Sequence, residues 1–300
     1  MIINEVGPRD GLQSQAGELS LAQRSEFVDA LLGAGLAHIE IGSFVSPRAV
    51  PQMAGTDELA RALLGRACGA ELSALVPNMR GYENARAAGV ETVAVVVSAT
   101  ETMNQRNINM SLAETFRVAA SVIDRGHSEG ASVQAYLAVA FECPFEGAVD
   151  AGLVRDQARE LLDAGASLLV IADTIGAANP AAVNRLMRDL VAEHGADRLA
   201  CHFHDTRALG VANVYAALEA GVRRFDASVG GLGGCPFAPG ARGNVATEDV
   251  VMLCEQMGFS TGIDLAALLG VVDLISDMLG RPQGGRAIEW LRRYAVPEAA

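Results

Sequence analysis

The sequence predicts an α/β fold of the (β/α)8 TIM-barrel class, with extra helices after the barrel. Short β-branched runs alternate with longer segments of helical periodicity, the alternation repeats about eight times, and several helical segments end at a glycine. A doubly wound sheet is the alternative, but no GxGxxG motif follows the first expected strand. No long linker divides the chain, so a single catalytic domain is expected over residues 1–300.

The expected strands are short, β-branched and bounded by turn residues. They are Ile2–Glu5, His38–Ile41, Leu72–Val76, Thr92–Val97, Val133–Ala138, Leu168–Ala172, Leu199–His204 and Phe225–Val229. Apolar spacing near 3.6 residues predicts helices between them, including Ser20–Ala34, Ser111–Glu129, Ala151–Ala164, Pro180–Glu193 and Leu209–Ala220. The barrel is expected over about residues 1–260. A C-terminal cap or oligomer contact is expected over about 261–300, with helices at Asp264–Leu279 and Arg286–Arg293.

Composition excludes several classes of function. No apolar run approaches the ~20 residues of a membrane span, and the start of the chain resembles a strand, so a cytoplasmic protein is expected. A net charge of −13 argues against nucleic acid and anionic membrane surfaces as partners. All 23 basic residues are arginine, so no side chain can form a Schiff base, and carbonyl chemistry would need a metal as electrophile.

Polar residues gather at the ends of the expected strands, where a barrel of this class carries its active face. The strongest metal signal is the pair His202 and His204, because alternation along a strand places both on one face. Asp10 follows the first strand and Asn244 follows the last, and these strands are neighbours in a closed barrel. Their oxygens would complete a site for Mg²⁺ or Mn²⁺ that also tolerates Zn²⁺ or Co²⁺. Taken alone, Asp10 is equally typical of a turn.

Three further charged residues are candidates for function or for structure. Arg9 is either a solvated loop residue or a fixed cation that faces a developing oxyanion beside the metal. Glu40 and Asp173 lie within or just after apolar runs, and buried carboxylates need partners. For Glu40 the partner would be Arg9 or a metal ligand, and the alternative is an ion pair that joins the first two strands. For Asp173 a functional role is favoured.

Residues 230–249 are dense in glycine and contain one cysteine, Cys235. Such a segment suits a lid that carries a thiol to a substrate better than it suits a core. The five cysteines lack paired spacing, which argues against a disulfide framework or a CxxC zinc site. Cys143 precedes a proline and is ambiguous, whereas Cys68, Cys201 and Cys254 lie in patterns typical of packing.

Several motifs together resemble the hydroxymethylglutaryl-CoA lyase family. They are EVGPRDGLQ at 5–13, SFVSP at 43–47, DTIG at 173–176, HFHDT at 202–206 and GLGGCPFAPGARGN at 231–244. The resemblance runs in order from the first strand to about residue 280. The cysteine-containing glycine motif distinguishes these lyases from related metal-dependent acyl-CoA condensing enzymes, which carry a GlyGluArg-type sequence there.

The resemblance implies an acyl-CoA substrate, a homodimer and a divalent metal, most simply Mg²⁺ or Mn²⁺. The implied metal ligands are Asp10, His202, His204 and Asn244. Arg9 would stabilise the acetyl-CoA enolate, Gln13 and Glu40 would bind substrate, Asp173 would support catalysis and Cys235 would shuttle a proton. The implied reaction is retro-Claisen cleavage of 3-hydroxy-3-methylglutaryl-CoA to acetoacetate and acetyl-CoA. The base would be Asp173, His202 or a metal-bound water.

The chain departs from the family pattern at a few positions. Ala208 stands where a glycine is usual, Gln15 and Ala16 where some members have a lysine, and Arg242 where a small residue is usual. None is an implied ligand, so the departures bear on the substrate, which could instead be a related branched 3-hydroxyacyl-CoA. Three less favoured functions are a condensing synthase, which Cys235 argues against, a catalytically silent barrel, and an iron oxygenase with two histidines and a carboxylate.

Overall fold

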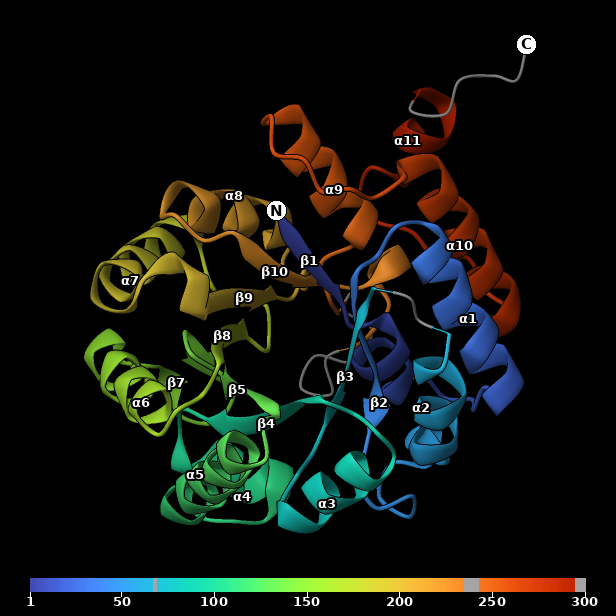
Figure 1. Cartoon of the computed structure of the whole chain (residues 1–300). Helices are drawn as coiled ribbons and strands as arrows, with labels where there is room; N and C mark the ends of the chain where they lie inside the picture. The colour runs from blue at the N-terminus through green and yellow to red at the C-terminus, as the bar shows by residue number, and fades with distance from the viewer. Residues whose placement is uncertain (67–68, 235–242, 295–300) are drawn as a thin grey trace.

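The chain folds into a closed barrel of parallel strands with helices around it (Figure 1). The computed structural model describes residues 1–66, 69–234 and 243–294. The barrel strands are β1 (Ile2–Glu5), β2 (His38–Ser43), β3 (Glu71–Leu75), β4 (Thr92–Ser98), β5 (Ser132–Ala138), β8 (Leu168–Asp173), β9 (Leu199–Phe203) and β10 (Arg224–Ala227). Their order is β1-β10-β9-β8-β5-β4-β3-β2, and β2 pairs with β1 to close the sheet. The predicted fold is confirmed.

Helices follow the strands along the chain and cover the outside of the barrel. They are α1 (Leu21–Gly33), α2 (Thr56–Leu64), α3 (Met79–Ala87), α4 (Glu101–Ile108), α5 (Leu112–Ser128), α6 (Ala151–Asp163), α7 (Pro180–His194), α8 (Gly210–Glu219) and α9 (Thr247–Gln256). Ser20 and Ser111 begin α1 and α5 with capping boxes, each exchanging hydrogen bonds with the third residue of its helix. The extra helices α10 (Leu265–Leu279) and α11 (Ile288–Tyr294) follow, and α10 packs against α1 and α9.

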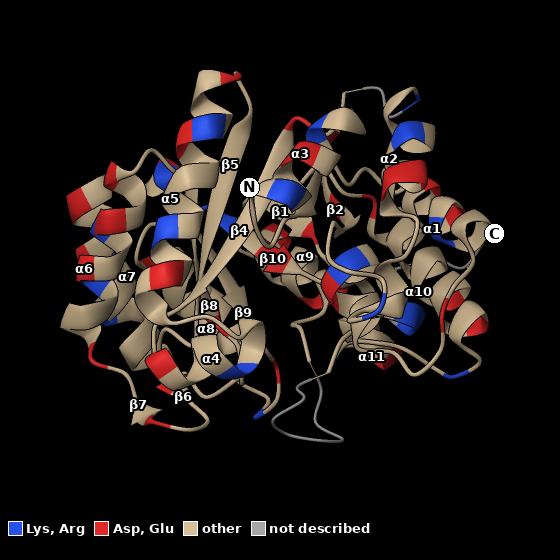
Figure 2. Ribbon diagram, turned by 90° about the horizontal axis from the view of Figure 1, so that it is seen from below, with Lys and Arg blue, Asp and Glu red and all other residues tan. Residues whose placement is uncertain are grey.

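The hydrophobic core has two parts. The larger part lies between the strands and the helices, and a small cluster contains Tyr136, Val170 and Ala200 from the strands β5, β8 and β9. Charged residues lie mainly on the helices and loops, as Figure 2 shows in blue and red. The apolar cluster shares its strands with polar side chains such as His202, so the barrel carries a polar end where chemistry can be placed.

Besides shifts of one or two residues at the ends of other elements, such as β2 and β10, three differences from the sequence prediction stand out. β9 ends at Phe203, because His204 leaves the parallel ladder and forms an antiparallel bridge with Asn244. α11 begins at Ile288, two residues later than predicted. A short hairpin, β6 (Glu142–Cys143) with β7 (Gly147–Ala148), was not predicted. Within the described ranges, no helix is both long and apolar enough to span a membrane.

Candidate metal centre and active site

Three predicted ligands meet at the carboxyl ends of β1 and β9. Asp10 lies in the short turn η1 (Gly7–Gly11) after β1, His202 lies in β9, and His204 follows β9 directly. One ligand atom from each lies within 4.8 Å of the others, and His204 Nε2 is 3.9 Å from Asp10 Oδ2. Both histidines are buried and the carboxylate is mostly buried. The cluster has the ligand types and the spacing of a metal site.

Asn244 joins this cluster from the segment after β10. Its Nδ2 donates to Asp10 Oδ2 at 2.8 Å and to the Leu232 carbonyl at 3.0 Å. Its buried Oδ1 has no partner among residues 1–66, 69–234 and 243–294, and the same is true of His204 Nδ1. Gly233 makes this approach possible, because a Cβ there would lie 2.7 Å from Asn244 Nδ2. Unpartnered buried acceptors beside a carboxylate fit a bound cation.

The charge states of Asp10 and His204 also suit a cation. Burial alone would raise the pKa of Asp10, but the Arg9 guanidinium and the two histidines lower it to about 2. Burial and the neighbouring His202 lower the pKa of His204 to about 4. Near neutral pH the site therefore offers an ionised carboxylate and a neutral imidazole, which are the forms that bind metals.

Asp226 orients His202 and was missed by the sequence analysis. The Asp226 carboxylate, on β10, lies 3.0 Å from His202 Nδ1 and accepts a hydrogen bond from Asn4 Nδ2 at 2.9 Å. The Tyr136 ring packs edge-on against the imidazole, with ring centroids 6.3 Å apart. An acidic residue inside an apolar strand was the criterion that identified Glu40, and applied to Phe225–Val229 it would have found Asp226.

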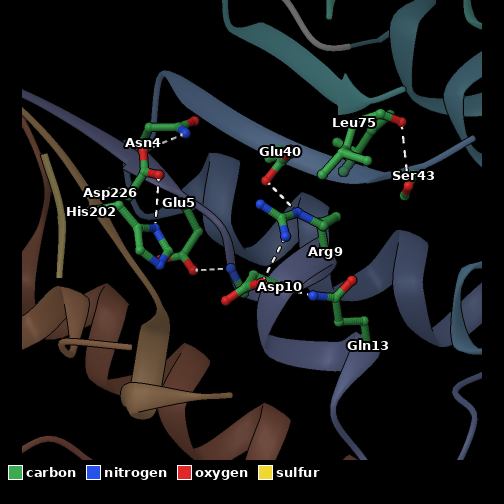
Figure 3. A network of polar contacts seen from close by, with 12 residues as sticks. Asn4, Glu5, Arg9, Asp10, Gln13, Glu40, Ser43, Leu75, His202 and Asp226 are labelled. Atoms are coloured by element: carbon green, nitrogen blue, oxygen red, sulfur yellow. Dashed lines mark hydrogen bonds and ion pairs between the residues drawn. The ribbon is translucent and has the colours of Figure 1, made fainter. Parts of the chain in front are cut away.

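Arg9 lies between two carboxylates, as Figure 3 shows. Its Nε donates to Glu40 Oε2 at 2.6 Å and its Nη1 to Asp10 Oδ1 at 2.7 Å, while Gln13 Nε2 donates to the same Asp10 oxygen at 2.8 Å. Burial alone would lower the pKa of Arg9, but Glu40 and Asp10 raise it, so the cation is fixed. Burial raises the pKa of the Glu40 carboxyl, and Arg9 opposes that rise. The predicted Arg9–Glu40 pair is confirmed, and because it links β2 to the turn after β1 it fits both the functional and the structural interpretation of Glu40. The solvated alternative for Arg9 is wrong.

The remaining predicted residues have different surroundings. Asp173 ends β8, and its two oxygens accept the backbone N–H groups of Ala177 at 2.8 Å and Ala178 at 3.1 Å. Burial raises the pKa of Asp173 to about 6, and its catalytic role stays a prediction. Cys143 is buried and its sulfur accepts a hydrogen bond from the Thr100 hydroxyl. Cys235 lies outside the described residues.

Comparison with known proteins assigns the family. The family model described as HMGL-like matches residues 1–275. The chain belongs to this family. Among curated relatives, hydroxymethylglutaryl-CoA lyase of Pseudomonas mevalonii is 46% identical over 94% of each chain. A 3-hydroxy-3-isohexenylglutaryl-CoA/hydroxy-methylglutaryl-CoA lyase of Pseudomonas aeruginosa is 42% identical over 96% of this chain and 95% of its own. The (R)-citramalyl-CoA lyase of Chloroflexus aurantiacus is 44% identical over 93% of this chain and 91% of its own.

Solved structures agree with the family assignment. The crystal structure of the Bacillus subtilis HMG-CoA lyase superposes with a TM-score of 0.94 at 40% identity, and the match covers 97% of each chain. The barrel and its C-terminal helices are therefore common to this chain and that HMGL-like protein. Family members with these names are carbon–carbon lyases, and this chain is one of their close homologues over nearly its full length.

Proposed function

We propose that this chain is a divalent-metal-dependent lyase that cleaves 3-hydroxy-3-methylglutaryl-CoA to acetoacetate and acetyl-CoA. The observation that carries the proposal is the buried cluster of Asp10, His202 and His204 with the Arg9–Glu40 pair beside it. The 46% identity to a hydroxymethylglutaryl-CoA lyase supports the choice of substrate.

The four predicted ligands would hold the ion, which we propose to be Mg²⁺ or Mn²⁺. Carboxylate and amide oxygens favour these hard cations, while two imidazoles also accept Zn²⁺. A bound ion would supply Lewis acidity that polarises the oxygens of the substrate. The ligands are Asp10, His202, His204 and Asn244.

The protein side chains have separate tasks in the bond cleavage. A base takes the proton of the C3 hydroxyl, the C2–C3 bond breaks, and C3 becomes the ketone carbon of acetoacetate. The electron pair of the broken bond forms the acetyl-CoA enolate, whose negative charge the fixed Arg9 cation stabilises. Cys235 then protonates C2, and the proton taken by the base returns to the sulfur through solvent.

Asp173 is the side chain we favour as the base, because the two ring nitrogens of His202 would be taken by the ion and by the Asp226 carboxylate. Asp173 and His202 lie at the same end of the barrel, close enough for charge on His202 to lower the pKa of Asp173. Hydrogen bonds to Ala177 and Ala178 occupy one lone pair on each Asp173 oxygen, so a second lone pair can still accept a proton. Glu40 would bind substrate through Oε1, which is buried and has no hydrogen-bond partner among the described residues, and Gln13 would bind it through the amide oxygen.

A product assay tests the proposal. The purified protein with Mg²⁺ is incubated with 3-hydroxy-3-methylglutaryl-CoA, its isohexenyl analogue and citramalyl-CoA in parallel, and acetoacetate and acetyl-CoA are quantified. The highest kcat/KM is expected for the methyl substrate. No cleavage of it by metal-loaded protein would contradict the proposal, and acetyl-CoA-dependent condensation with a 2-oxo acid would establish the synthase function instead. The expected homodimer and cytoplasmic location stay predictions, and sedimentation analysis measures the first.

A further inference from the structure

The segment that joins α10 to α11, residues 281–287, contacts three of the loops at the carboxyl ends of the strands. The contacts are hydrogen bonds from Arg281 to Gln15 after β1, from Gly284 to Gly230 after β10, and from Arg286 to Asp205 after β9. The same three loops carry Asp10, Asn244 and His204. We call residues 281–287 the C-terminal clasp.

The backbone of the C-terminal clasp is tied to the barrel at consecutive residues. Four successive N–H groups, those of residues 284–287, donate to the Gly230 carbonyl, to Glu248 and twice to Asp249. Gly285 cannot be replaced easily, because a Cβ there would lie 2.5 Å from Asp249 Oδ2 and 2.6 Å from Ala246 Cβ. These backbone contacts therefore hold the C-terminal clasp in position independently of its side chains.

From this position Arg286 makes two hydrogen bonds to Asp205. Its Nε donates to Asp205 Oδ2 and its Nη2 donates to the Asp205 carbonyl at 3.0 Å. A planar guanidinium can make both contacts at once, so it restrains the side chain and the backbone of Asp205 together. The other carboxylate oxygen of Asp205 accepts the Gly210 N–H at the start of α8, at 2.9 Å.

Asp205 lies between two of the metal-site residues. It follows His204 directly, and its N–H donates to the carbonyl of Gly243, which precedes Asn244, at 2.6 Å. His204 and Asn244 are themselves paired in an antiparallel bridge, and the Val245 N–H donates to the Phe203 carbonyl at 3.0 Å on the other side. A displacement of Asp205 would therefore move both ligands relative to Asp10.

We propose that Arg286 is a positioning residue for the metal centre, acting through Asp205 on the spacing of His204 and Asn244. The inference rests on the proposed function, since it requires a divalent ion at these ligands. Arg286 touches neither the ion's ligands nor the reacting atoms, so its effect is on the affinity of the site and not on the chemical step.

Direct binding of Mn²⁺ to metal-free full-length protein, followed by electron paramagnetic resonance, tests the inference. Arg286→Ala is expected to raise the dissociation constant of Mn²⁺ roughly tenfold, the lower end of what is typical for residues that support metal ligands. Turnover of 3-hydroxy-3-methylglutaryl-CoA should fall at limiting Mn²⁺ and recover at saturating Mn²⁺. Arg292→Ala is the matched control, because the Arg292 side chain is as exposed as that of Arg286, at 44%, and also pairs with an aspartate. That ion pair joins α11 to Asp273 on α10 and involves none of the proposed ligands.

A double-mutant cycle separates positioning from a general loss of stability. Asp205→Asn keeps an acceptor for the Gly210 N–H but removes the charge that Arg286 binds. The double variant Arg286→Ala/Asp205→Asn should bind Mn²⁺ more tightly than the product of the two single effects predicts. Additive effects, or an Arg286→Ala affinity equal to that of Arg292→Ala, would overturn the inference while leaving the proposed function intact. A wild-type protein that does not bind Mn²⁺ would overturn both.

Discussion

His202 and Asp226 lie side by side on β9 and β10, and Nδ1 of the imidazole is 3.0 Å from Oδ2 of the carboxylate. A carboxylate in this place holds the proton on Nδ1 and leaves Nε2 with its lone pair for a cation. Asn4 fixes the other carboxylate oxygen, so the orientation is set from three strand positions. The metal affinity of the proposed site should therefore depend on Asp226, which is not one of the proposed ligands.

Replacing Asp226 by asparagine should weaken metal binding. The new amide can offer its oxygen to Asn4 or to His202 but not to both, and its NH₂ group would favour the wrong tautomer of the imidazole. We expect a loss of roughly 10–100-fold in Mn²⁺ affinity, measured by titration of metal-free protein. Asp273→Asn, on the exposed face of α10, serves as the control, and equal affinities for the two variants would refute this role of Asp226.

Cys235→Ala should remove turnover and leave metal binding unchanged. If the thiol supplies the proton for C2, its loss should lower kcat by roughly 10²–10⁴-fold. Cys254→Ala is the control, because Cys254 is fully buried in α9 and burial raises the pKa of its thiol to about 11. Cys254→Ala should lower the free energy of unfolding and keep the wild-type kcat. Wild-type turnover in Cys235→Ala would show that the proton comes from elsewhere.

Ala208→Gly should stabilise the protein. Ala208 has φ of 59°, in the left-handed region, which costs an L-residue about 1 kcal/mol. Glycine adopts this conformation without that cost, so the substitution should raise the free energy of unfolding by up to about 1 kcal/mol. Ala120→Gly, in the middle of the right-handed helix α5, should lower it by a similar amount. Denaturant unfolding measures both, and changes of the same sign would contradict the argument.

Glu5→Gln should change how stability depends on pH. Burial raises the pKa of Glu5 from 4.5 to about 7 in the folded protein, despite hydrogen bonds from Thr247, Val229 and Gly7. A raised pKa means that the folded protein binds a proton at Glu5 more tightly than the unfolded chain does. The carboxyl therefore contributes stability, up to about 3 kcal/mol, that is complete below pH 4.5 and is lost as pH rises through about 7.

Glutamine keeps an acceptor for the backbone N–H groups and can donate to the Thr247 hydroxyl, so the variant should fold. The free energy of unfolding of the wild-type protein, relative to Glu5→Gln, should fall between pH 4.5 and pH 7.5. Urea unfolding at several pH values checks this, and parallel curves for the two proteins would show that Glu5 does not titrate in this range.

Most of the barrel could be predicted because its strands and helices carry local signals. Buried β-branched runs and 3.6-residue spacing depend only on neighbouring residues, and the order of strands in a closed barrel then placed Asp10 beside Asn244 and His204. Asp226 was missed because its partner lies on a strand 24 residues away, and only the register of β9 with β10 shows the contact. The pattern of 286–287 predicted the start of a helix, whereas hydrogen bonds to a distant acidic side chain hold these two residues in the C-terminal clasp.

Metal-dependent turnover tests the central claim most directly. The protein is stripped with a chelator, titrated with Mn²⁺, and assayed for acetoacetate from 3-hydroxy-3-methylglutaryl-CoA beside the variant Asp10→Asn/His204→Ala. We predict that stripped protein is inactive, that activity returns in proportion to Mn²⁺ until one ion is bound per chain, and that the variant neither binds Mn²⁺ nor turns over. Full turnover by metal-free protein, or by the variant, would contradict the account.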